Sequence, residues 1–274
     1  MSRITINPER PFCGKPLGPY DPKNDAFEKY KERTDNLPPI GKGKIDWSKL
    51  DLSKVETMVA NNPGVPIWTA LAKAKEQGKI IVPNSVHDRM LVETNHWQKD
   101  DIKAGYAAWI GTAIIYEKPD TAFGDKVVCN WEHDRVNYSI TFNIPEQFRG
   151  KANCALIAEH PDFELVSLGN NSYELKADEK SISLLENFPK ETFNMGGYHY
   201  DERFRIPVGE PLNVQQADNT VRYLWRIAGS YIGLLARDYR GFDRQRVVGA
   251  GGCPSYPLGV HVISREAAPP KNEG

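Results

Sequence analysis

The chain has 274 residues, a formal net charge of −1 and a hydrophobic content of 40%. This length suits one large domain or two small ones, and a compact chain of this size folds without disulfides or metals. The near-neutral charge argues against a general polyanion-binding protein. The sequence contains no apolar run long enough for a membrane span and no signal-peptide core at its start, so we expect a soluble, cytoplasmic protein.

Residues 1–45 differ from the rest of the chain because they hold seven of its 20 prolines. Proline fixes the backbone angle φ and lacks an N–H donor, so this segment is neither a long helix nor a central strand. Two interpretations fit: a solvated N-terminal arm, and an extended arm that lies across its own domain or a neighbouring subunit. Large apolar residues favour docking, because a fully solvated tail carries fewer of them. They are Phe12, Leu17, Tyr20, Phe27 and Tyr30.

Residues 46–104 are predicted to form a small α-rich region. Ser53 and Glu56 have the spacing of a capping box, which predicts the start of a first helix. A second helix is expected where Pro66 suits the first turn and Gly78 suits the position just after the end.

The same region continues with a short strand at residues 80–82. A third helix follows, for which Ser85 and Asp88 are the expected capping residues. Its inward-facing residues are expected to be Val86, Met90 and Leu91.

From residue 105 to residue 265 the apolar pattern changes to a period of two, which predicts a mainly antiparallel β domain. Residues 106–118 are apolar on both faces and predict a central strand. Residues 135–145 alternate strictly between apolar and polar, so they predict a strand with one buried face. Gly169 and the two asparagines after it predict a hairpin turn. Residues 179–189 predict a short helix.

The predicted fold class is therefore α+β: a Pro-rich N-terminal arm and a small helical region precede a mainly antiparallel β-sandwich or barrel. Two or three further strands are expected within residues 220–248, and residues 256–264 form the last one. Residues 266–274 are predicted to be a frayed tail.

Polar residues gather in the stretch MGGYHYDERFRIP, residues 195–207. If this stretch is a strand, His199 and Asp201 point to one side and Glu202 points to the other. An imidazole beside a carboxylate suits general acid–base catalysis, because its pKa lies near neutrality. His199, Asp201 and Glu202 are therefore the candidate catalytic residues, and a hydrolase or lyase is the expected enzyme class. Two alternatives remain open: a polar strand edge whose charges pair with their neighbours, and a ligand-binding strand.

Signatures of metals and cofactors are weak in this sequence. The six histidines never pair as HxH or HxxxH, so a metal site would need His133, His160 and His199 to converge in a sheet. The glycine-rich residues 247–259 lead into prolines rather than a helix, which argues against a phosphate loop. No cofactor and no metal are predicted. The four cysteines form no CxxC pair; they are Cys13, Cys129, Cys154 and Cys253.

Residues 203–246 hold eight arginines, no lysine and only four acidic residues, with aromatic residues among them. The planar guanidinium binds carboxylates and phosphates in two places and stacks on rings. Three interpretations compete: Arg–carboxylate pairs that brace the sheet, a subunit interface, and a groove for nucleic acid or another anion. The candidate interface or anion-binding residues are Arg222, Trp225, Arg226, Arg237, Tyr239, Arg240 and Arg244.

The leading functional hypothesis is an interaction or assembly subunit of a multi-protein complex, with copies of itself among its partners. It accounts for the Pro-rich arm, for the Arg–aromatic segment and for the lack of a catalytic motif. An enzyme with an acid–base site around His199 and Asp201 is the first alternative. An anion- or nucleic-acid-binding β module is the second, and no membrane partner is expected.

Overall fold

The computed structural model describes part of the chain in the following ranges: 45–59, 67–93, 107–133, 136–191, 197–212, 222–226, 228–238, 246–249 and 259–270. Apart from Ile45, the Pro-rich segment lies outside these ranges, as do Cys13 and Cys253. Within them the chain is mostly β-structure, with two α-helices and three sheets. No helix in these ranges is long and apolar enough to cross a membrane.

The elements follow one another along the chain as follows. The helices are α2 (Ile67–Glu76) and α3 (Asn84–Glu93), with short 3-10 turns η1 (Trp47–Lys49), η2 (Leu52–Lys54), η4 (Glu146–Phe148) and η5 (Arg265–Ala267). The first nine strands are β1 (Glu56–Val59), β2 (Lys79–Ile81), β3 (Ala107–Tyr116), β4 (Lys126–His133), β5 (Val136–Asn143), β6 (Ala155–Glu159), β7 (Phe163–Gly169), β8 (Ser172–Ala177) and β9 (Ser183–Leu185). The later strands are β10 (His199–Tyr200), β11 (Pro207–Val208), β12 (Tyr223–Trp225), β13 (Tyr231–Asp238), β14 (Arg246–Gly249) and β15 (Gly259–Ser264).

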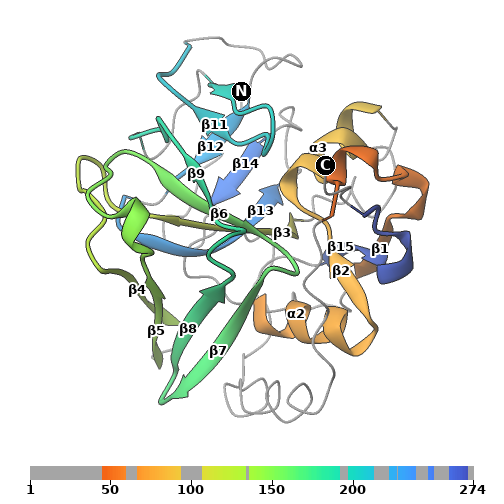
Figure 1. Ribbon diagram of the computed structural model, residues 1–274, viewed down its shortest axis with the longest axis horizontal. Helices are drawn as coiled ribbons and strands as arrows, with labels where there is room; N and C mark the ends of the chain where they lie inside the picture. The colour runs from red at the N-terminus through yellow and green to blue at the C-terminus, as the bar shows by residue number, and fades with distance from the viewer. Residues whose placement is uncertain are drawn as a thin grey trace, which may run out of the picture.

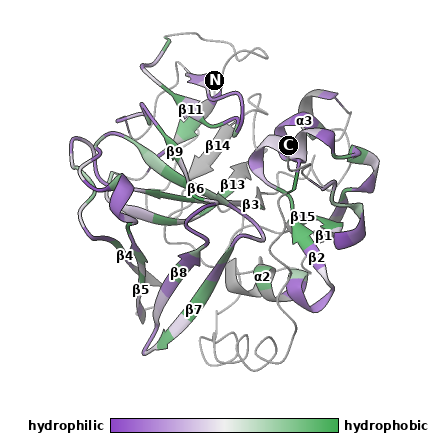
Figure 2. Ribbon diagram, viewed as in Figure 1, coloured by the Kyte–Doolittle hydropathy of each residue, from purple (hydrophilic) through white to green (hydrophobic). Residues whose placement is uncertain are grey.

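The largest sheet has nine strands in the order β1-β15-β3-β13-β14-β12, with β2 paired to β15 and β6 paired to both β3 and β9. Strand β3 lies at its centre, because β13 pairs along one edge of β3 while β15 and β6 share the other. Most pairs are antiparallel, but β15 with β3 and β12 with β14 are parallel. Strand β15, which is largely hydrophobic (Figure 2), joins β1 and β2 to the rest of the sheet.

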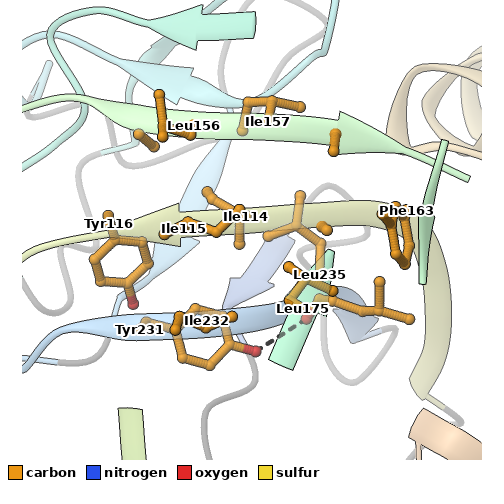
Figure 3. Packing of buried hydrophobic residues seen from close by; sticks show 14 of the residues in the cluster. Ile114, Ile115, Tyr116, Leu156, Ile157, Phe163, Leu175, Tyr231, Ile232 and Leu235 are labelled. Carbon is orange, nitrogen blue, oxygen red and sulfur yellow. Dashed lines mark hydrogen bonds between the residues drawn. The ribbon is translucent and has the colours of Figure 1, made fainter. Parts of the chain in front are cut away.

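A second sheet has four strands in the order β4-β5-β8-β7 and occupies the lower left of Figure 1, while α2 and α3 lie to the right beside β2 and β15. The two sheets share one hydrophobic core, to which the smaller sheet contributes Val127, Ile140 and Leu175. The larger sheet contributes residues such as Ile115 and Ile232. Figure 3 shows the centre of this core, where side chains from β6, β3 and β13 lie side by side. The described strands form layered sheets, not a closed barrel.

A smaller core lies between η1, α3, β2 and β15, and it includes Trp47, Val86 and Met90. The segment after β15 returns to the start of the described chain: Ile45 pairs with Pro270, and the Asp46 N–H donates to the Pro269 carbonyl at 2.9 Å. Helix α3 is therefore held on the sheet by apolar contacts on the face that Val86 and Met90 occupy, as its sequence predicts. The same helix carries the polar residues of the candidate site.

The clearest patterns of the sequence are confirmed. Strand β3 is buried throughout residues 109–116, as expected of a central strand. Strand β5 buries Tyr138, Ile140 and Phe142 and exposes Asn137 and Asn143. Gly78 follows α2 with φ of 62°, the left-handed conformation that ends helices. The turn between β7 and β8 has φ of 51° and 57° at its two asparagines, Asn170 and Asn171.

Two of the expected helices are wrong. Ser53 lies in η2, where its N–H donates to the Asp51 side chain, and Glu56 begins β1, which pairs with β15. Residues 183–185 form β9, which pairs with β6. In both segments a strand distant in the sequence supplies ladder hydrogen bonds, and these outweigh a weak local preference for helix.

Candidate functional site

The stretch around His199 forms a β-hairpin, which we define as residues 198–208. Strands β10 and β11 pair in antiparallel register, and the Asp201 N–H donates to the Ile206 carbonyl at 2.9 Å. The chain turns back at Arg205, which has a φ of 57°. The expected single strand is therefore wrong beyond Tyr200, because the turn breaks the alternation of its side chains.

Asp201 shapes the tip of the hairpin. Its Oδ1 atom accepts hydrogen bonds from the Arg203 N–H at 2.9 Å and the Phe204 N–H at 2.8 Å. Among the hydrogen bonds of the described residues, none joins His199 to Asp201 or Glu202, and the side chains of His199 and Glu202 are exposed. Asp201 thus uses one carboxylate oxygen to hold the turn, and the acid–base role of His199, Asp201 and Glu202 stays a prediction.

A buried ion pair between Arg222 and Asp88 supports the hairpin. Arg222 pairs with Tyr198 through two backbone hydrogen bonds, and its guanidinium grips Asp88 of α3 through Nε–Oδ1 and Nη2–Oδ2 contacts of 2.8 Å each. Arg222 is 1% exposed and Asp88 is 3% exposed. The guanidinium carbons of Arg222 and Arg205 lie 4.4 and 5.0 Å from the centre of the Tyr200 ring. A bidentate pair of this kind fixes orientation as well as distance.

Asn84, the first residue of α3, ties the hairpin to the sheet. Its Nδ2 donates to the carbonyls of Phe204 at 2.8 Å and Arg205 at 2.9 Å, while its N–H donates to Thr112 Oγ1 at 2.9 Å. Thr112 lies on the central strand β3, directly opposite Glu159 of β6. We call the residues beneath the hairpin its polar seat; they are Asn84, Asp88, Thr112, Glu159 and Arg222.

Glu159 is a member of the polar seat whose pKa is raised. Burial raises its pKa to about 7, the positive charge of Arg203 lowers it and the negative charge of Asp162 raises it. Its neighbour His160 is fully buried, and its Nδ1 accepts a hydrogen bond from the Ile81 N–H at 3.2 Å. Burial lowers the pKa of His160 to about 4. At pH 6 the folded chain therefore holds Glu159 largely protonated and His160 neutral.

These two neighbours predict a compensated dependence of stability on pH. Between about pH 4.5 and 6.5, the ordinary values of the two groups, unfolding removes the proton from Glu159 and adds one to His160. A raised carboxyl pKa makes stability fall as pH rises, whereas a lowered imidazole pKa makes it rise, so the two slopes cancel. In Glu159→Gln the free energy of unfolding should climb with pH by up to about 1.4 kcal/mol per unit, the cost of one proton.

The matched variant His160→Gln should show the opposite slope, because only Glu159 then titrates. Urea unfolding at a series of pH values measures both slopes, and the two variants serve as each other's control. Equal slopes in the two variants would contradict the assignment.

Arg226 belongs to a separate buried brace. It is 2% exposed, its guanidinium donates to the carbonyls of Pro189 and Glu117, and it lies over the rings of Tyr116 at 4.7 Å and Phe188 at 5.2 Å. Burial lowers the pKa of Arg226. Internal bracing is thus the interpretation that describes both Arg226 and Arg222. Neither presents a surface to a partner or an anion, since their contacts lie within the chain.

The side chains of the other candidates in the Arg–aromatic segment lie outside the described part of the chain. Trp225 lies in β12 and Arg237 in β13, with their side chains outside the described part; Tyr239, Arg240 and Arg244 lie wholly outside it. In the described ranges no group of three metal-ligating side chains converges. His160 is instead used as a hydrogen-bond acceptor and His199 is exposed, while the side chain of His133 is outside those ranges.

Sequence reasoning missed most of the polar seat. Asp88 was expected to cap its helix, yet it pairs with a residue 134 positions away. Glu159 belongs to the His-and-carboxylate stretch AEHPDFE, but nothing local marks it as opposite Thr112. The one usable signal was Asn84, since an asparagine after proline at a helix start is a capping position. Its side chain binds the hairpin, at the carbonyls of Phe204 and Arg205.

The hairpin and its polar seat thus combine exposed charged residues at the tip, a rigidly held backbone and a carboxyl group that titrates near neutral pH. Comparison of the chain with models of protein families, with curated protein sequences and with solved structures finds no match. The hairpin and its seat are therefore the basis on which a function is assigned.

Proposed function

We propose that this chain is an interaction subunit that assembles with further copies of itself, and that the hairpin is the element it presents. The observation that carries this proposal is the contrast between the two sides of the hairpin. Its underside is held by the buried Arg222–Asp88 pair and by Asn84. On its other side the hairpin leaves His199 of β10 and Glu202 of the tip exposed to solvent.

The energetics of association favour such a construction. Holding a flexible loop still costs free energy on binding, and a loop that is already held avoids that cost. Burying an arginine is also expensive unless its charge is fully paired. The alternatives fit less well, because Asp201 Oδ1 accepts two hydrogen bonds within the turn and Arg222 and Arg226 are buried.

Reversing the charge at the tip tests this proposal. We expect the wild-type chain to have a mass that is a multiple of 30.9 kDa in native mass spectrometry and light scattering. Glu202→Lys should shift the chain toward the single-subunit mass, because a misplaced charge at an interface costs affinity. Its unfolding midpoint should stay near that of the wild type, since exposed substitutions change stability little.

Glu164→Lys is the matched control, because Glu164 is an exposed glutamate on β7 of the other sheet. It should leave the assembly unchanged. Two results would overturn the proposal: a wild-type chain that stays a single subunit at every concentration, or an assembly that Glu202→Lys and Glu164→Lys affect equally.

A further inference from the structure

The tip of the hairpin carries an arginine beside a carboxyl group that titrates near neutral pH. The Arg203 guanidinium lies 4.6 Å from the centre of the Phe204 ring. It also acts on Glu159 through its charge, yet no ion pair within 4.0 Å joins these two described residues. Arg203 therefore lies over a ring while a titratable carboxyl group remains close to it.

The backbone on both sides of Arg203 is held by hydrogen bonds, while its side chain is exposed. The Arg203 N–H donates to Asp201 Oδ1, and the carbonyls of the next two residues, Phe204 and Arg205, accept hydrogen bonds from Asn84. The Asn84 N–H in turn donates to Thr112, the strand partner of Glu159. This chain of contacts connects the tip of the hairpin to the strand pair that carries Glu159, and the charge of Arg203 acts on the Glu159 pKa.

We propose that Arg203 has two docking positions, the ring of Phe204 and the carboxylate of Glu159, and that loss of the Glu159 proton moves it from the first to the second. A neutral carboxyl group attracts a guanidinium only weakly, so Arg203 stays over the Phe204 ring while Glu159 is protonated. An ionised, partly buried carboxylate attracts it strongly, because charge–charge attraction exceeds attraction to a ring at comparable distance.

Arg203 is the cation whose charge lowers the pKa of Glu159 against the effect of burial. On the segment of Glu159, Asp162 is negative and His160 stays neutral above a pH of about 4 because burial lowers its pKa. From β3 Glu159 is faced by Thr112, its strand partner, which does not titrate. The polar seat also holds Asn84, which does not titrate, and the charged Arg222–Asp88 pair, whose two charges are joined to each other by two contacts of 2.8 Å. Because burial raises the Glu159 pKa to about 7, the switch lies in the neutral range. A role of this switch in regulating assembly rests on the proposed function. The movement of the Arg203 side chain itself does not depend on that function.

Nuclear magnetic resonance of arginine-labelled chain at increasing pH tests the movement directly. Protons of the Arg203 side chain over the Phe204 ring should be shifted upfield at pH 5, and this shift should be lost with a midpoint near the Glu159 pKa. In Glu159→Gln the upfield shift should persist at every pH. In Phe204→Leu it should be missing at every pH.

Arg149, an exposed arginine outside the hairpin that pairs with Asp125, is the internal control and should show no such transition. An Arg203 signal that ignores pH in the wild type, or the same transition in Glu159→Gln, would overturn the proposal. Repeating the titration in Glu202→Lys separates the two proposals, because the side chain should still switch there even if the hairpin is no interface.

Discussion

Replacing Arg222 with methionine is expected to destabilise the fold by about 3–5 kcal/mol, the usual cost of removing one partner of a buried ion pair. Methionine fills much of the same volume, so the loss reflects charge and hydrogen bonds, not a cavity. The Asp88 carboxylate, 3% exposed, would lose both of its guanidinium contacts. Urea unfolding followed by circular dichroism measures the change in free energy.

Two further variants separate the causes. Arg222→Lys keeps the charge but loses the planar fork, so its cost should fall between those of the wild type and Arg222→Met. Arg149→Met removes an arginine from a surface pair whose partner, Asp125, is 85% exposed, and it should cost less than about 1 kcal/mol. Equal costs for Arg222→Met and Arg149→Met would mean that the buried pair does not support the hairpin.

Gly111→Ala is expected to be nearly as damaging, with a loss of about 3 kcal/mol, the upper part of the range for overpacked sites. A Cβ atom at this position would lie 2.1 Å from the carbonyl oxygen of Ile81 and 3.1 Å from that of Val82. Both are backbone atoms, and the Gly111 N–H itself donates to the Val82 carbonyl at 2.8 Å. The end of β2 therefore crosses β3 where only a glycine leaves room, and thermal or urea unfolding will show the effect.

Gly124→Ala provides the matched control. No atom lies within 4 Å of a Cβ built at Gly124, so this substitution should change stability by less than about 0.5 kcal/mol. If Gly111→Ala lowered the free energy of unfolding as little as Gly124→Ala, the close approach of β2 to β3 at Gly111 would be contradicted.

Local sequence patterns predicted the elements whose structure depends on residues close together in the sequence. Strand β5 has one solvent-exposed face and one buried face, and the alternation of apolar and polar residues over 135–145 indicates this directly. The turn at Asn170 and Asn171 needs two residues with positive φ, and few residue types tolerate that. Such segments carry their own structural information, so a single sequence is enough to find them.

Other segments take their structure from partners elsewhere in the chain. Strands β1 and β9 are four and three residues long, and they exist because β15 and β6 offer free edges. The candidate site is subject to the same limit: the sequence picked out His199 and Asp201 by adjacency, whereas the contacts that hold the hairpin join Asp88 to Arg222 and Asn84 to Phe204. Pairing of this kind leaves no periodic trace in a single sequence.

The position of β15 also bears on how the chain is made. This strand lies between β1 and β3, and it pairs with β2 as well, although it follows all the other strands in the sequence. During synthesis from the N-terminus, β1 and β2 emerge before β15, and the strands from β3 to β14 are made between them and their sheet partner. Until β15 is made, the nascent chain therefore carries unpaired strand edges, and such edges favour pairing between neighbouring chains.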